Sequence, residues 1–190
     1  MVKGETTGHG SEYLVELCGK EVMIMFRKMR RFKQQLAEDE CIEILKNSTS
    51  GVLGLLGDED YPYTVPVSHV YKDGKLYFHG AKTGHKNDAA ASHEKVSYCV
   101  IEKDDVVQER VTTYYRSVIC FGRIRIIEDQ DEKMKAALMI GERFAPDNKE
   151  GYMNEIDKLF KVMTVFEITI EHMTGKEAIE LLRAREGINL

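Results

Sequence analysis

The segment at residues 78–86, FHGAKTGHK, is the part of the chain best suited to hold an anion. Gly80 and Gly84 would let the backbone approach a ligand closely, because glycine carries no Cβ. Positive charge would come from Lys82, His85 and Lys86. A helix that begins near Lys86 would also present free N–H groups and the positive end of its dipole. The pattern is that of a phosphate site or, as the alternative, of an ordinary strand-to-helix turn with solvent-exposed lysines.

The other reactive side chains match no catalytic or metal-binding motif. Four histidines lie close together in the sequence: His69, His79, His85 and His93. Their spacing fits neither HExxH nor a zinc pattern, so we expect partly buried or surface histidines and no metal site. Walker, GxGxxG and GxSxG motifs are missing, which leaves ATP, Rossmann and serine-nucleophile sites without support. Cys99 and Cys120 fall in apolar runs and are interpreted as reduced core residues.

Short strands must position the 78–86 segment. Apolar runs and alternation predict strands over residues 51–57, 63–71, 76–80, 95–102, 113–129 and 162–175. Asp73 and Gly74 form the centre of a predicted hairpin turn. Pro66 cannot donate to a β-ladder, so it marks an edge, a bulge or a place where the sheet opens. The long strand over 113–129 is expected to bend at Gly122.

Helices are predicted around these strands, over residues 37–46, from about 86, over 131–144 and 155–161, and in the tail at 176–187. The helix over 131–144 has an apolar face formed by Met134, Ala137, Leu138, Gly141 and Phe144. Residues 103–112 are expected to be a charged loop. Antiparallel strands at short spacing favour a small barrel with peripheral helices, although periodicity alone does not separate it from an α+β sandwich.

Length and charge narrow the class of protein. A chain of 190 residues suits one domain, which we expect over residues 25–190 with a helical tail, after a poorly ordered or loosely docked N-terminal arm at 1–24. The net charge of −5 argues against general nucleic-acid binding, and the basic run at 27–33 is interpreted as a solvated segment. No apolar stretch approaches the ~20 residues of a membrane helix, so we expect no membrane partner and a cytoplasmic location.

Several blocks of the sequence, in order, resemble the flavin-binding nitroimidazole-resistance proteins. These belong to the pyridoxamine 5'-phosphate oxidase-like family of FMN-binding split barrels. The blocks lie within residues 25–182: CIEIL, GVLGLLGDEDYPYTVPVSHVY, DGKLYFHGAKTGHK, YYRSVICFGRIRIIED and IEHMTGKEA. The resemblance implies a mainly β fold, a small antiparallel split β-barrel of about six strands with flanking α-helices.

The resemblance also implies where a flavin would bind. In the oxidases a turn of this length holds the FMN phosphate, with an arginine in place of His85, so the charge here would depend on pH. The strand at 64–68 matches the segment whose backbone runs along the isoalloxazine ring, and Ser117 stands for the glutamine of a flavin-contacting RQV segment. The implied cofactor-binding residues are Val65, Pro66, Val67, Ser68, His79, Gly80, Ala81, Gly84, His85, Lys86 and Ser117.

His79 is the implied catalytic residue, because the resistance proteins have a histidine near the flavin at its position. It would position a small-molecule substrate or supply a proton. The implied cofactor is FMN, with FAD as the alternative, bound between the two protomers of a homodimer. Residues that bind pyridoxal phosphate in the oxidases have no convincing match, which argues against vitamin B6 oxidation.

The function that this resemblance implies is a flavin-dependent oxidoreductase that reduces nitroaromatic compounds such as nitroimidazoles. Two alternatives remain open, because a fold does not decide a function. One is a carrier or sensor that binds a flavin nucleotide without turnover. The other is a haem-associated protein of the same fold.

Overall fold

The computed structural model describes residues 13–17, 20–24 and 26–187. The chain divides into a segment that ends at Lys33 and a larger unit, Gln34–Leu190. In the first segment β1 (Tyr13–Leu17) and β2 (Lys20–Ile24) pair as antiparallel strands, which the sequence analysis did not predict. Residues 1–12, 18 and 19 of the predicted arm, and residue 25 at the predicted domain start, lie outside the described residues. The predicted domain boundary therefore stays a prediction.

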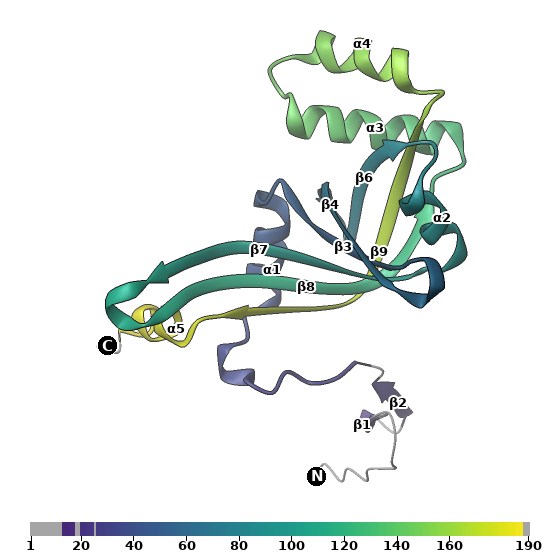
Figure 1. Ribbon diagram of the computed structural model, residues 1–190. Helices are drawn as coiled ribbons and strands as arrows, with labels where there is room; N and C mark the ends of the chain where they lie inside the picture. Colours follow the sequence, from purple (N-terminus) through teal and green to yellow (C-terminus); the bar gives the residue numbers. More distant parts are fainter. Residues whose placement is uncertain (1–12, 18–19, 25, 188–190) are drawn as a thin grey trace. The chain divides into compact units, whose positions relative to one another are not determined.

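Seven antiparallel strands form the sheet of the larger unit, in the order β4-β3-β7-β8-β9-β6-β5 (Figure 1). Their bounds are β3 (Ser50–Leu56), β4 (Pro62–Ser68), β5 (Val70–Lys72), β6 (Lys75–Ala81), β7 (Lys95–Val107), β8 (Thr112–Ile126) and β9 (Met163–Glu177). Pro66 lies in β4, an edge strand, as its missing N–H donor predicts. The predicted turn at Asp73 and Gly74 joins β5 to β6, and both residues have positive φ.

The two edge strands of this sheet follow one another in the chain. β4 ends at Ser68 and β5 begins at Val70, so His69 alone connects opposite edges of the sheet. The sheet must therefore curl, yet among the described residues no ladder joins β4 to β5, and the curled sheet is not closed. The predicted single strand over 63–71 was wrong, because the chain crosses between edges at the fully buried His69. The predicted mainly β fold with flanking helices is confirmed.

β7 and β8 form a longer hairpin than the sequence indicated. Val107 stands opposite Thr112, with an irregular register between Ile101 and Lys103, so the predicted charged loop over 103–112 was wrong for most of its length. Charged residues there mark an exposed ladder, because a two-stranded extension has no core to face. The predicted bend in β8 stays a prediction, but the ladder is irregular at the residue that was predicted. The register of β8 with β9 shifts between Phe121 and Gly122, and a Cβ on Gly122 would lie 2.2 Å from the Thr169 carbonyl oxygen.

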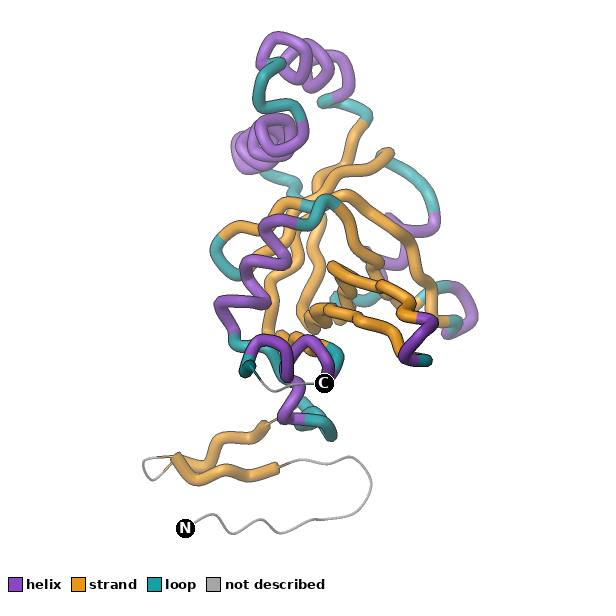
Figure 2. Tube along the Cα trace, turned by 90° about the vertical axis from the view of Figure 1, so that its left-hand side faces the viewer, coloured by secondary structure: helices purple, strands orange, loops and turns teal. Residues whose placement is uncertain are grey.

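Five α-helices surround the sheet in the described chain: α1 (Glu38–Asn47), α2 (His85–Ser92), α3 (Gln130–Phe144), α4 (Lys149–Leu159) and α5 (Ile179–Arg185). α1 and α2 pack on the main core, which includes Ile44, Phe78, Ala89 and Phe166. α3 and α4 lie side by side and form a second core with Val70 and Val165 of the sheet (Figure 1 and Figure 2).

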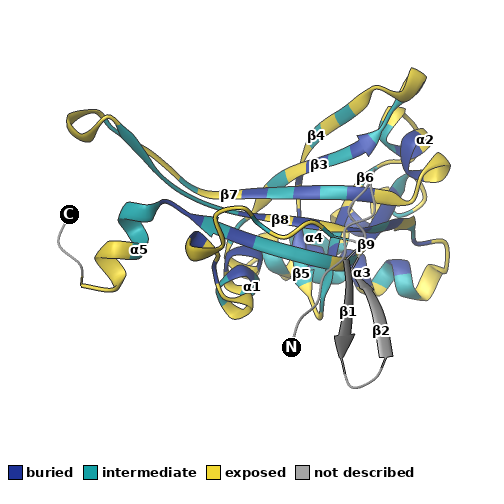
Figure 3. Cartoon of the chain, turned by 90° about the horizontal axis from the view of Figure 1, so that it is seen from below, coloured by how far each residue is buried: buried dark blue, intermediate teal, exposed yellow. Residues whose placement is uncertain are grey.

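Burial along the chain follows these two cores (Figure 3). Cys120 is buried and Cys99 is half-buried, while Cys18 lies outside the described residues. Among the described residues, no helix combines the length and the apolar character needed to span a bilayer.

Candidate functional site

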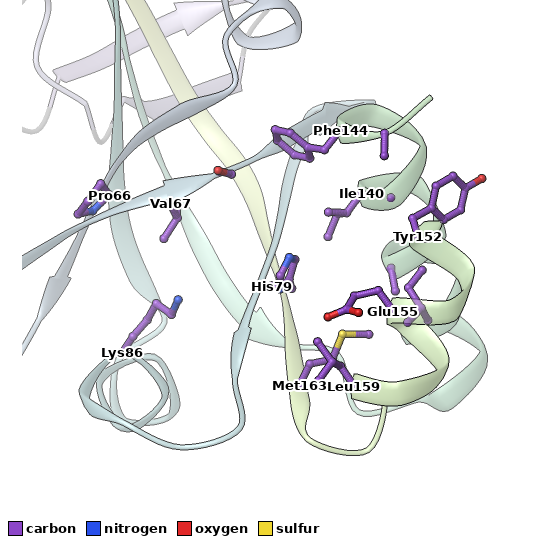
Figure 4. A pocket seen from close by; sticks show the side chains of 15 residues that line it. Pro66, Val67, His79, Lys86, Ile140, Phe144, Tyr152, Glu155, Leu159 and Met163 are labelled. Carbon is purple, nitrogen blue, oxygen red and sulfur yellow. The ribbon is translucent and has the colours of Figure 1, made fainter. Parts of the chain in front are cut away.

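A cavity of about 470 Å³ lies between the sheet and the α3–α4 hairpin (Figure 4). One side, called the sheet wall below, consists of Pro66, Val67 and Ser68 of β4, His79 of β6 and Lys86 of α2. The other side, called the helical wall, consists mainly of α3 and α4 residues: Ala137, Ile140, Gly141, Phe144, Ala145, Tyr152, Glu155, Ile156 and Leu159, with Met163 of β9 beside them. The cavity thus has one wall with basic and polar groups and one wall that is largely apolar.

Lys86 is the cation of the sheet wall. Its Nζ lies over the backbone of Gly80, where a Cβ would approach to 2.8 Å, and it is 5.5 and 5.4 Å from the ring centroids of Phe78 and Phe166. Partial burial lowers the pKa of this ammonium, because burial disfavours charge. Within the described residues no ion pair is formed by Lys86. A partly buried cation without a counter-ion is suited to bind an anion.

The start of α2 lies next to this lysine. Gly84 caps the helix with a φ of 123°, a conformation that favours glycine, and its carbonyl accepts from the Asn87 N–H at 2.8 Å. The Asn87 side chain donates from Nδ2 to the Ala81 carbonyl at 3.0 Å and so ties the end of β6 to the first turn of α2. Among the described residues its buried Oδ1 has no partner. Sequence reasoning missed Asn87, although an amide in a first helical turn is a recognisable signal.

His79 projects into the cavity from β6 (Figure 4). Its neighbour Phe78 is fully buried, so alternation along the strand places the imidazole on the opposite side, as the sequence indicated. Desolvation and, secondarily, the charge of Lys86 lower the pKa of His79, so the imidazole is neutral at neutral pH. A neutral imidazole can still donate one N–H to a ligand.

The helical wall was not predicted as part of the site. Its α3 face carries Ala137, Gly141 and Phe144, which the sequence analysis identified as an apolar helix face, but periodicity alone cannot say what such a face contacts. Tyr152 of α4 packs so closely on Gly141 that a Cβ there would lie 2.7 Å from its ring. Glu155 adds a carboxylate, which Figure 4 shows pointing from α4 toward the side where His79 lies.

Lys133 fixes the helical wall from within. It lies on α3 and is buried, and its Nζ donates to the carbonyl of Phe160 at the end of α4, at 2.6 Å. The ammonium is also 4.6 Å from the Phe160 ring centroid. The two helices are therefore joined by a polar contact in addition to the apolar packing.

Six of the predicted flavin-binding residues do not line the cavity: Val65, Gly80, Ala81, Gly84, His85 and Ser117. Gly80 lies directly beside Lys86, a lining residue, whereas the backbone carbonyls of Ala81 and Gly84 are bonded to Asn87. Val65 packs against the main core.

His85 and Ser117 lie apart from the cavity. The His85 ring stacks on Tyr63, with centroids 4.1 Å apart, and its Nε2 accepts from the Asp58 N–H at 3.4 Å. This stacking directs the imidazole toward the β3–β4 turn, and the structure does not bring it together with Lys86. Ser117 stands in β8 between Ile101 of β7 and Lys176 of β9.

Comparison with known proteins places the chain in a family. Residues 37–177 match the family model for pyridoxamine 5'-phosphate oxidase. The chain belongs to the pyridoxamine 5'-phosphate oxidase-like family. A comparison with curated proteins gives no match.

Solved structures of this family share the fold. A candidate 5-nitroimidazole antibiotic resistance protein from Bacteroides thetaiotaomicron is 21% identical, with a TM-score of 0.62 over 75% of this chain and 86% of that chain. An FAD-binding protein from Mesorhizobium loti is 26% identical, with a TM-score of 0.53 over 76% and 96% of the two chains. An FAD and haem binding protein from Mycobacterium smegmatis is 19% identical, with a TM-score of 0.64 over 80% of each chain.

Proposed function

We propose that this protein binds a flavin nucleotide, FMN in the first place, with its phosphate at Lys86 and the start of α2. The observation that carries the proposal is the Lys86 ammonium, which is partly buried over Gly80 and has no ion-pair partner in the described chain. A phosphate would pair with this charge and accept from free N–H groups at the helix start. The FAD-binding relative from Mesorhizobium loti supports a flavin nucleotide, and FAD is the alternative to FMN.

The volume of the cavity and the backbone groups along its β4 edge are suited to such a ligand. Its volume of about 470 Å³ lies in the range of small-molecule sites. β4 is an edge strand, so its backbone groups on the side away from β3 are available to the polar edge of an aromatic ring. The helical wall offers Ile140, Phe144 and Leu159 as apolar contacts.

The proposed activity is the reduction of nitroaromatic compounds. A bound flavin would supply the electron transfer, while the protein supplies binding and orientation. His79 would donate its N–H to a nitro oxygen, and the apolar helical wall would exclude water from the reacting groups. The similarity in fold to the candidate nitroimidazole-resistance protein supports this class of substrate.

The proposed assembly is a homodimer. Val52, Cys99 and Ile119 stand side by side across β3, β7 and β8, and Val52 and Ile119 are exposed. A second protomer would bury this apolar row. Ser117 lies two residues from Ile119 on the same face of β8, so it would reach a flavin bound by the partner chain. Ile119→Glu should then give a monomer by light scattering, and a wild-type monomer that binds FMN would contradict the dimer.

Ligand titration tests the proposed function. The purified protein should be yellow or take up FMN stoichiometrically, with a rise in melting temperature as the ligand stabilises the folded state. If saturating FMN and FAD both leave flavin fluorescence and melting temperature unchanged, the proposal is wrong.

A second measurement separates the enzyme from a carrier. Bound flavin that is reduced by a nicotinamide cofactor should be reoxidised by a nitroimidazole. A carrier would exchange its flavin readily and show no such cycle, and a haem protein would show a Soret band.

A further inference from the structure

The last carbonyl groups of α1 accept hydrogen bonds from residues beside both walls of the cavity. On the sheet side, His69 Nε2 donates to the Leu45 carbonyl at 2.9 Å. On the helical side, Arg143 Nη2 donates to the carbonyls of Lys46 and Asn47, at 3.1 and 3.0 Å. Carbonyls at a helix C-terminus have no partner within the helix, and a cation there is favoured by the helix dipole. The end of α1 is therefore bonded from two directions.

His69 links the end of α1 to the sheet wall. It follows Ser68 directly, is fully buried, and its N–H donates to the Thr49 carbonyl at 3.1 Å. Because Nε2 faces a carbonyl it carries the proton, so Nδ1 of the neutral ring accepts from the Tyr98 hydroxyl at 2.9 Å. The same hydroxyl is 3.1 Å from the Val67 carbonyl, and its one hydrogen can be donated to either acceptor. The backbone of Val67 and Ser68 therefore lies against the buried His69–Tyr98 pair and continues directly into His69.

Arg143 links the end of α1 to the helical wall. It lies in the last turn of α3, between Gly141 and Phe144, and both of these residues line the cavity. Its guanidinium carbon is 6.0 Å from the Phe144 ring centroid. If Arg143 lost its two carbonyl partners, the last turn of α3 would lose its polar contact with α1.

We propose that the C-terminal end of α1 is the common anchor of the two cavity walls, with His69 and Arg143 as the positioning residues that set the distance between them. Neither side chain lines the cavity, so both act through the residues beside them. The bond network also explains why the crossing between the sheet edges occurs at a buried histidine. The effect on a bound flavin rests on the proposed function, whereas the anchor itself does not.

Hydrogen exchange of the flavin-free protein tests the anchor directly. Arg143→Gln removes the guanidinium charge and its two hydrogen bonds to the carbonyls at the end of α1. It should speed amide exchange in the sheet wall, at residues 62–72, by roughly three- to thirtyfold. Arg110→Gln is the matched control, because Arg110 makes its hydrogen bond to Tyr114 on the β7–β8 hairpin. A change confined to residues 44–49 and 134–146 would overturn the common anchor. If Arg143→Gln fails to fold, Arg143→Lys replaces it. This variant keeps the charge, so it should speed exchange at residues 62–72 by a smaller factor.

Flavin affinity gives a second readout. Arg143→Gln and Tyr98→Phe should each weaken FMN and riboflavin by the same factor, roughly threefold to tenfold, because the anchor positions the walls and leaves Lys86 in place. In the double variant the loss should be smaller than the product of the single losses, since both changes release one anchor. Independent losses that multiply would contradict the proposal. If the wild type takes up no flavin at all, the proposed function fails, and the exchange experiment still decides the anchor.

Discussion

The two walls of the cavity are built in different ways. The sheet wall draws on β4, β6 and α2, and its groups are held by backbone ladders, by the helix cap at Gly84 and by the Asn87 amide. The helical wall comes from one continuous stretch of chain, α3 and α4, held by packing, by the Lys133 contact and by the side-chain hydrogen bonds of Arg143 to α1. One wall presents a cation and an imidazole, and the other presents mostly apolar side chains.

This difference indicates that the two walls have different roles. Groups that must meet a charged ligand lie on the wall whose backbone is fixed by hydrogen bonds, where small displacements are costly. The apolar wall can change its side chains with little effect on the sheet. We therefore expect changes in the sheet wall to affect flavin binding or chemistry, and changes in the helical wall to affect the choice of substrate.

The largest expected effect separates catalysis from binding on the sheet wall. His79→Ala should keep FMN and the dimer while slowing nitro reduction by roughly 10²–10⁴, if the imidazole donates a proton or a hydrogen bond. The measurement is single-turnover reoxidation of the reduced flavin by a nitroimidazole. An unchanged rate in the variant would remove the catalytic role.

The pH profile of that rate sharpens the test. The pKa of His79 is lowered by burial and by Lys86, so the protonated acid is populated only below the ordinary histidine range. If His79 acts as a proton donor, the wild-type rate should rise as pH falls through this lowered pKa. The same rise in His79→Ala would assign the titration to another group.

An intermediate effect is expected at Gly80. Gly80→Ala would place a methyl group 2.8 Å from the Lys86 ammonium, and the flexible lysine end can move aside without unfolding the protein. FMN affinity should fall about tenfold, because the cation is displaced from its position. In a Lys86→Ala background the same substitution should cost nothing further. An equal loss in both backgrounds would mean that Gly80 contacts the ligand by itself.

The smallest effect is expected on the helical wall. Glu155→Gln removes an exposed carboxylate, so FMN affinity should change less than about threefold. The KM for a nitroaromatic that carries an ammonium group should rise by up to about fivefold, with no change for a neutral analogue. Steady-state kinetics with the two substrates measure this difference. A fold-loss in FMN affinity that exceeds the change in KM for the cationic substrate would contradict the division between the walls.

Local features of the fold could be predicted from the sequence. The Asp-Gly turn, the edge position of Pro66 and the direction of His79 each follow from a short-range rule about donors, φ angles or alternation. The predicted helix that begins at the 78–86 turn is also present.

Features that depend on tertiary packing were missed. Alternation runs from residue 63 to 69 and is broken only at Val70, which is too weak a signal to reveal that His69 connects opposite edges of the sheet. His85 has the same spacing that a phosphate-binding arginine has in the oxidases, yet its ring stacks on Tyr63, a contact that exists only once β4 and α2 are in place. The apolar face of α3 was recognised, but its contact with a cavity depends on where the α3–α4 hairpin docks.

The proposed flavin site depends above all on Lys86, which would hold the phosphate of the nucleotide. The most direct measurement is the affinity of Lys86→Ala for FMN and for riboflavin, which lacks the phosphate, with the exposed Lys82→Ala of the same loop as the control. We expect Lys86→Ala to lose about ten- to a hundredfold in FMN affinity, the range of a charge-assisted bond, and far less in riboflavin affinity. Equal losses for the two ligands would show that Lys86 supports the fold and does not hold the phosphate.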